Sequence, residues 1–324
     1  MCTAATYQTG HFYFGRNLDL DYNYRESVTV TPRAYPFEFR CGTAIRKHFA
    51  LIGMATVESG YPLYYDATNE HGLSMAGLNF PKNAVYYPYV ETKENIAPFE
   101  LIPWLLGQCA DTDEAEVLLR KLNLWNEPFS DAFPLSALHW ILADRKRCLV
   151  LEPMENGMQI YNNPIGILTN NPPFEFHMHN LAQYMNLTVH QPENRFSDKI
   201  KLEPFSLGMG SVGLPGDMSS PSRFVKAAFT KLNSFSDTIE EESISQFFHI
   251  LGSVVQQRGL TETQPGKFEY TLYSSCCNTD KGIYYYRTYD NSQINAVDMH
   301  KENLDGVVLA TYPLITRQKI KMQN

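Results

Sequence analysis

The stretch 1-MCTAATYQTGHFYFGRNLDLD-21 decides how this sequence is interpreted, because it puts a cysteine directly after the first methionine. Its residues 1–9 and 11–18, separated by the turn signal Gln8-Thr9-Gly10, predict two hairpinned strands. Cysteine oxidises readily and chain ends are usually loose, so a thiol here needs an explanation. Three explanations are open: an accident of composition, a packing residue on a first strand, or a nucleophile that uses its own α-amine once Met1 is removed.

The chemistry of the second residue makes the third explanation attractive. Methionine is removed efficiently only when the next residue is small, and cysteine is small. Removal would leave Cys2 with a thiol and a free α-amine, whose reference pKa of about 8 provides an unprotonated base at neutral pH. One residue would then supply both nucleophile and base. Taken alone, Cys2 favours the explanation of a packing thiol buried on a first strand.

Polar residues elsewhere in the chain could complete such a site. FGRNLD places Arg16 and Asp19 on the second predicted strand, where a carboxylate can hold the amine and a guanidinium can favour the thiolate. An ordinary ion pair at a strand end would have the same pattern. AGLNFP and LTNNPP place Asn79, Asn170 and Asn171 at the ends of apolar strands, and asparagine amides can donate to an oxyanion. As isolated motifs these asparagines are turn residues.

The totals narrow the class of protein. The 324 residues are 44% hydrophobic and 19% charged, with no linker to divide them, so we expect one domain over 1–324, mature from Cys2. A net charge of −8 argues against a nucleic-acid partner. No leader pattern and no apolar run of membrane-span length is present, which favours a cytoplasmic protein. The six cysteines lack a CxxC pair and indicate neither a disulfide framework nor a zinc ribbon.

Predicted strands and helices alternate in blocks. The predicted strands, beyond the first two, cover 26–32, 49–57, 72–79, 267–277, 282–290 and 293–300, and a hairpin joins 135–142 to 148–153. The predicted helices cover 98–109, 110–125, about 177–186, 219–233 and 240–257. In 219–233, Ser220 is the expected N-cap and Pro221 the first helical residue. This order favours an α+β fold in which two antiparallel sheets carry helices on their outer faces.

Two histidine motifs do not predict a functional site. His177-x-His179 has no third ligand at a useful spacing, so no metal is expected. His139 alternates with apolar residues in LHWIL, which is typical of a histidine in the core or at its rim.

In combination, several motifs resemble one known family. MCTAATY with FGRNLD, then NEHGLSMAGLNFP, GILTNNPPF, GLPGDMSSPSRF and YTLYSSCCNTDKGIYYYRTYDNSQINAVDM, resemble the choloylglycine hydrolase family, and in particular its bacterial bile salt hydrolases. The motifs occur in the family's order from Cys2 to about residue 313. The resemblance implies an N-terminal nucleophile hydrolase: an αββα sandwich of two antiparallel sheets flanked by helices, with the active site at one end of the sheets.

The resemblance also implies roles for individual residues. Cys2 would be the nucleophile, with its α-amine as the base, and Asn79 would donate to the oxyanion with help from Asn170. The implied catalytic set is Cys2, Arg16, Asp19, Asn79, Asn170 and Arg223, with no cofactor and no metal. The implied substrate is a glycine- or taurine-conjugated bile salt, cleaved at its amide bond through a thioester. The implied assembly is a homotetramer.

A steroid body requires an apolar pocket. The family's pocket loops fall on Leu18, Tyr65, Phe129, Phe133 and Leu138 in this sequence. Phe129 and Phe133 could equally form a local hydrophobic clasp within their proline-flanked loop. Glu58 falls at a pocket-loop position where an apolar residue is expected, which leaves the steroid and the amino-acid preference open.

Two other functions are compatible with the same residues. A penicillin V acylase-like enzyme would use the same nucleophile on a phenoxyacetyl amide, but such acylases resemble one another in carrying tyrosine where this chain has Asn79. A non-catalytic sterol-binding module of the same fold would bind the ligand without needing Cys2.

Overall fold

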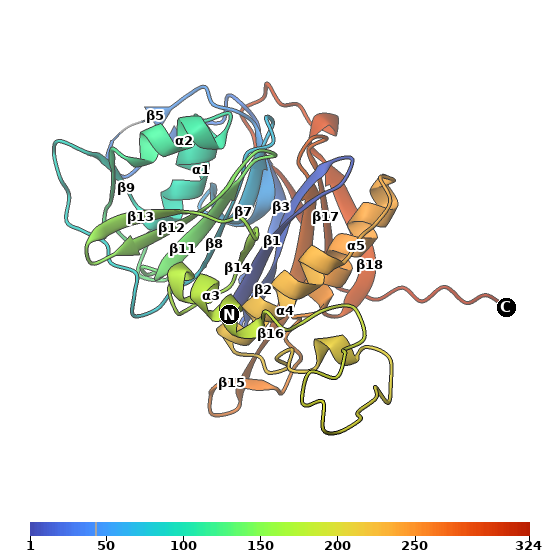
Figure 1. The fold of residues 1–324 in the computed structure, drawn as a ribbon. Coiled ribbons are helices and arrows are strands. Elements are labelled where there is room, and N and C mark those ends of the chain that lie inside the picture. The colour runs from blue at the N-terminus through green and yellow to red at the C-terminus, as the bar shows by residue number, and fades with distance from the viewer. Residues whose placement is uncertain (43) are drawn as a thin grey trace.

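The computed structural model describes residues 1–42 and 44–324 and consists of two stacked sheets with helices on their outer faces (Figure 1). In the described residues the first sheet has seven strands, in the order β14-β1-β2-β16-β17-β18 with β15 added on β16. Their bounds are β14 Ile167–Leu168, β1 Cys2–Gln8, β2 Phe12–Leu20, β16 Lys267–Asn278, β17 Ile283–Thr288, β18 Asn291–Asp298 and β15 Thr261–Gln264.

The second sheet has eight described strands, in the order β13-β12-β11-β8-β7-β6-β3-β19. Their bounds are β13 Gly157–Asn162, β12 Cys148–Met154, β11 Leu138–Ala143, β8 Ser74–Asn79, β7 Tyr61–Asn69, β6 Leu51–Glu58, β3 Ser27–Thr31 and β19 Ala310–Pro313. Neighbouring strands are antiparallel throughout both sheets. The predicted α+β sandwich of two antiparallel sheets is confirmed.

Helices cover the outer face of each sheet (Figure 1). The α-helices are α1 Leu101–Leu106, α2 Thr112–Leu119, α3 Phe174–Leu181, α4 Ser220–Asn233 and α5 Glu240–Gly252. Short 3-10 turns span Pro98–Glu100, Ala182–Tyr184, Met209–Ser211 and Met299–Lys301. Two short ribbons pair β4 Phe37–Glu38 with β5 Ala44–Ile45, and β9 Glu94–Ile96 with β10 Leu122–Leu124. In the described residues, no helix combines the length and apolar character of a membrane-spanning segment.

The core consists of two apolar clusters. The first includes Ile52 and Ile141 of the second sheet, Phe14 of the first sheet, and Phe224 and Phe247 of the helices α4 and α5. The second lies between the second sheet and the helices α1 and α2. Because each sheet is covered on both faces, β2, β6 and β11 are buried along most of their length.

The first strand of the chain is a central strand. β1 lies between β14 and β2, and its register pairs Cys2 with Leu18. Close strand contact on the other side of β2 requires Gly15, since a Cβ there would lie 2.0 Å from the Ser275 carbonyl oxygen of β16. The start of the chain is therefore held inside the sandwich. For this reason the Cys2 thiol is buried although it lies near the end of the chain.

Tertiary contacts changed several predicted boundaries. α4 begins at Ser220 with Ser219 in the N-cap position, so the prediction of Ser220 as N-cap is wrong. The Ser220 hydroxyl instead donates to Thr169 Oγ1 and accepts the N–H of Asn170. The first helical residue is Ser220 and not the predicted Pro221, which is the second.

Other helices are shorter than predicted. α2 ends at Leu119, and 122–124 forms β10 because it pairs in parallel with 94–96. α5 ends at Gly252, since the backbone of Gln256 turns back to bond Thr271. The helix expected at about 177–186 begins earlier, at Phe174. The sequence patterns also missed β7 altogether.

Candidate active site

Cys2 is the first residue of β1 and is 2% exposed. Its N–H donates to Asn170 Oδ1 at 2.8 Å. The preceding residue continues the strand pairing: the Met1 nitrogen donates to the Asp19 carbonyl at 2.9 Å, and the Asp19 N–H donates to the Met1 carbonyl at 3.0 Å. The backbone of Cys2 is thus held on both sides, while the residue itself lines a cavity.

Arg223, in the first turn of α4, lies directly behind Cys2. Its Nη1 donates to the Cys2 carbonyl and to Thr3 Oγ1, each at 2.6 Å, and its Nη2 donates to Asn170 Oδ1 at 2.8 Å. The side chain is buried, and burial lowers the pKa of the guanidinium while the nearby Asp19 and Cys2 raise it. This fork geometry suits arginine, which presents its donors in a fixed plane.

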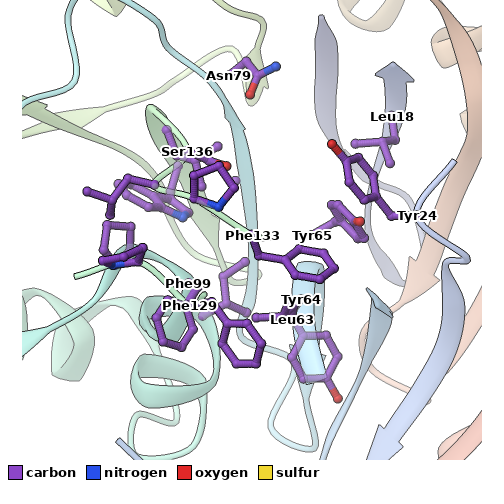
Figure 2. A pocket seen from close by; sticks show the side chains of 18 of the residues that line it. Leu18, Tyr24, Leu63, Tyr64, Tyr65, Asn79, Phe99, Phe129, Phe133 and Ser136 are labelled. Atoms are coloured by element: carbon purple, nitrogen blue, oxygen red, sulfur yellow. The ribbon is translucent and has the colours of Figure 1, made fainter. Parts of the chain in front are cut away.

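Asn170 joins Cys2 and Arg223 to Asn79. Its Oδ1 accepts from the Cys2 N–H and from Arg223 Nη2, and its Nδ2 donates to the Asn79 carbonyl at 2.8 Å. Asn79 ends β8 and lines the cavity, at the same end as Leu18 (Figure 2). Within the described part of the chain, the Asn79 side-chain amide makes no hydrogen bond, so its N–H groups are free to donate to a bound molecule.

Arg16 lines the same cavity as Cys2 and is fully buried. Its Nη1 donates to the carbonyls of Gly77 at 2.5 Å and Tyr65 at 3.0 Å. Its buried Nη2 has no hydrogen-bond partner in residues 1–42 and 44–324. Burial acts to lower the pKa of this guanidinium, but the opposing charges of Cys2, Tyr273 and Asp66 raise it above its usual value. Arg16 therefore remains a cation with one donor group unused.

Asp19 is a buried carboxyl group beside the start of the chain. Its Oδ1 accepts from the Thr271 hydroxyl at 2.6 Å, and its Oδ2 has no partner in the described residues. Burial raises the pKa of Asp19, against the lowering effect of the chain's amino group and of Arg223. Burial in turn lowers the pKa of the amino group of Met1, which also forms an ion pair with Glu269.

The cavity in front of Cys2 has a volume of about 390 Å³ and a largely aromatic and aliphatic lining (Figure 2). All five predicted pocket residues line it, namely Leu18, Tyr65, Phe129, Phe133 and Leu138. Glu58, which the resemblance places at a pocket-loop position, is not among the lining residues; it ends β6 and accepts a hydrogen bond from Ser59.

The pocket wall formed by residues 127–136 is held by ring contacts. Phe129 and Phe133 meet at a centroid distance of 6.0 Å, so they form the clasp and line the cavity as well. Phe129 also meets Phe99 at 5.2 Å, and Phe133 meets Tyr24 at 6.1 Å. The cavity is also lined by four residues that the sequence did not predict, namely Phe99, Tyr24 and the β7 residues Leu63 and Tyr64. For Tyr24 a signal was present, since its aromatic loop directly follows the strand with Arg16.

The structure therefore brings the six predicted catalytic residues to one end of the two sheets. Cys2 and its neighbours on β1 and β2 come from one sheet, Asn79 from the other, and Asn170 and Arg223 from the segment after β14 and from α4. A cysteine at the first position of a central strand, between two stacked antiparallel sheets, is the arrangement of an N-terminal nucleophile hydrolase.

Comparison with known proteins agrees with this class. The model of the linear amide C-N hydrolases, choloylglycine hydrolase family, matches residues 2–312. The chain is 56% identical over 314 residues to the bile salt hydrolase/transferase of Lactiplantibacillus plantarum, with 97% of each chain covered. It is 38% identical to the bile salt hydrolase/transferase of Clostridium perfringens, with 96% of each covered. The chain belongs to the choloylglycine hydrolase family of amide-cleaving hydrolases.

Solved structures give the same result for the fold. The C2A mutant of the conjugated bile acid hydrolase from Clostridium perfringens aligns with a TM-score of 0.93 at 37% identity, covering 100% of both chains. Penicillin V acylase from Agrobacterium tumefaciens aligns with a TM-score of 0.73 at 18% identity, covering 96% of this chain and 90% of the acylase. The second likeness concerns the fold alone.

Proposed function

We propose that this protein hydrolyses the amide bond of glycine- and taurine-conjugated bile salts, with Cys2 as the nucleophile. One observation carries the proposal: Cys2 lines an apolar, aromatic cavity of about 390 Å³ together with Asn79 and with Arg16, whose buried Nη2 has no partner in the described residues. A steroid is rigid and apolar and needs a lining of this kind. Relatives that cover almost the whole chain carry the name bile salt hydrolase/transferase.

The proposed reaction follows from the positions of these groups. The Cys2 sulfur attacks the amide carbonyl carbon, its proton passes to the α-amine, and the carbonyl oxygen becomes an oxyanion. The Asn79 amide and the free Nη2 of Arg16 are the donors available to that negative charge. The α-amine then protonates the leaving nitrogen, and glycine or taurine departs. Water cleaves the thioester, which releases the bile acid and restores the thiol.

This reaction requires the removal of Met1. With Met1 attached, the Cys2 nitrogen is a peptide N–H that donates to Asn170 and has no basic lone pair. Once freed, the amine would keep Asn170 Oδ1 as an acceptor, and Asp19, which acts on the amino group of Met1, is a candidate to hold its positive charge. Intact-mass measurement of active enzyme should show that Met1 is absent. Full activity in a preparation that retains Met1 would refute the role of the amine.

Release of glycine and taurine tests the substrate. We expect wild type to release both amino acids from glycocholate and taurocholate, and Cys2→Ala to release neither while still binding the bile salt. A clear preference for penicillin V would favour the acylase alternative instead. Ligand binding without any release by wild type would favour the sterol-binding module.

The relatives' names favour a second activity of the same thioester. An amino acid amine could replace water in the second step, forming a new amide while the thiol is restored. Incubating the enzyme with glycocholate and an excess of a second amino acid should then give the new conjugate, and Cys2→Ala should not. Formation of free bile acid alone would limit the enzyme to hydrolysis.

We also propose a cytoplasmic homotetramer, as the family resemblance implies. The segment 185–217 extends away from the sheets as the loop that follows α3 (Figure 1). It exposes large apolar side chains, with Phe196 84%, Phe205 88% and Leu207 91% exposed, and an exposed apolar set of this size is typical of an interface. Light scattering should give four subunits, and charged substitutions of these three residues should dissociate them. Fractionation of expressing cells tests the location.

A further inference from the structure

Asn170 is held at every one of its polar atoms. Its side chain bonds Cys2, Arg223 and Asn79 as described above, and its backbone N–H donates to Ser220 Oγ at 2.8 Å. Its carbonyl oxygen, the remaining polar atom, accepts from His177 Nε2 at 2.9 Å. The direction of the side chain is therefore set by what fixes this short stretch of backbone.

Two histidines donate to consecutive carbonyls of that stretch. His139 Nε2 lies 2.9 Å from the carbonyl oxygen of Thr169, next to the contact of His177 with Asn170. A carbonyl can only accept, so each Nε2 must carry the proton. Both rings are fully buried. Burial lowers the pKa of His177 to about 4, so at neutral pH its ring is neutral and its single proton lies on Nε2.

The two histidines are connected through Glu152. The Nδ1 of His139 lies 3.1 Å from Glu152 Oε1, and the same oxygen accepts the N–H of Phe174 at 3.0 Å. Phe174 is the first residue of α3, the helix that carries His177 back onto Asn170. One buried carboxyl group thus links the ring that holds Thr169 to the helix that holds Asn170.

We propose that His139 and His177 are positioning residues of the active site, which act by fixing the carbonyls of Thr169 and Asn170. This inference rests on the proposed function, because the direction of Asn170 matters only if Cys2 reacts. It assigns a task to two buried side chains that do not touch the cavity.

The competing explanation is packing alone. The ring of His177 stacks on Phe224 at a centroid distance of 4.7 Å, and the ring of His139 stacks on Phe80 at 4.2 Å. His177→Phe keeps a ring for the stack but has no donor. His177→Gln has an N–H donor but no ring. If positioning matters, His177→Gln should be the more active variant. If only packing matters, His177→Phe should be the more active one.

The test measures glycocholate hydrolysis by the full-length chain, with intact mass and thermal melting recorded for each variant. Loss of one hydrogen bond to Asn170 predicts a fall in kcat of about tenfold for His177→Phe, with KM within about twofold of wild type. We expect His177→Gln to recover most of that loss. His179→Phe is the matched control, because His179 is exposed on the same helix and is not among the hydrogen-bond partners of Asn170 in the described residues.

A second pair of variants keeps the test informative if His177→Phe does not fold. Glutamine and methionine have similar length, so His177→Gln and His177→Met differ mainly in the donor, and we expect kcat to differ about tenfold between them. Equal kcat values in this pair, or a folded His177→Phe with wild-type kcat, would overturn the positioning role. Absence of glycine release by wild type would instead overturn the proposed function.

Discussion

Replacing Arg223 by lysine keeps the buried positive charge but removes the planar fork. Arg223 donates four hydrogen bonds, to the carbonyls of Met218 and Cys2, to Thr3 Oγ1 and to Asn170 Oδ1. An ammonium group is a compact donor on a flexible stem and does not reach two separate sets of acceptors at once. We expect lysine to rebuild about half of these bonds.

The magnitude follows from the bonds that are lost. Hydrogen bonds to charged groups contribute about 1.5–3 kcal/mol each, so the loss of roughly two of them lowers the free energy of unfolding by about 3 kcal/mol or more. For a chain of 324 residues that corresponds to a fall in Tm of about 4 °C. Because the lost acceptors include Asn170 or the Cys2 carbonyl, kcat should fall by at least about tenfold.

Thermal melting measures the predicted change in Tm, and glycocholate hydrolysis by the same preparation measures the predicted change in kcat. Lys226→Arg is the matched control: Lys226 lies on α4, one turn from Arg223, and its side chain makes no hydrogen bond to the described residues, so it should tolerate the reverse exchange. The reasoning is refuted if Arg223→Lys melts within about 1 °C of wild type and keeps its kcat.

Three further predictions concern packing, the pocket and pH. Gly15→Ala should lower Tm strongly and reduce soluble yield, since its Cβ would lie 2.0 Å from backbone, whereas Gly216→Ala, in open space, should not. Phe129→Ala should raise KM for glycocholate by about tenfold with a smaller change in kcat, because it removes a ring from the cavity wall, and an unchanged KM would exclude Phe129 from binding. Wild type should lose up to about 3 kcal/mol of its free energy of unfolding between pH 6.5 and pH 4, because His177 binds a proton near pH 6.5 in the unfolded chain but only near pH 4 in the folded protein. Urea unfolding at the two pH values should show a smaller loss for His177→Gln. Equal losses in the two proteins would contradict the lowered pKa of His177.

Much of the fold was predictable because it depends on local pattern. The hairpin of β1 and β2, the hairpin of β11 and β12, and the strands β16, β17 and β18 all follow from alternating residues bounded by turn signals. The same local geometry brings Arg16 and Asp19 near Cys2, because the register of one hairpin fixes which residues lie opposite one another. The family motifs supplied the remaining site residues and the order of the layers.

Long-range contacts decided the rest. Asn79 and Asn170 are 91 residues apart, and Arg223 and Cys2 are 221 apart, yet hydrogen bonds join both pairs. No periodicity in the sequence encodes such pairs, since they form only when α4 and the second sheet pack against β1. The same packing draws the Ser220 hydroxyl away from capping α4, and it turns His177 from a weak metal motif into a donor to Asn170.

The sequence by itself therefore determined that Cys2 begins a strand and that Arg16 lies on the strand beside it, because neighbours in a hairpin are set by local spacing. Only the tertiary structure decided how the thiol is buried yet opens into a cavity, and which groups hold it there. Those groups come from both sheets and from α4, and the free energy that brings them together comes from burying the whole apolar core, to which every part of the chain contributes.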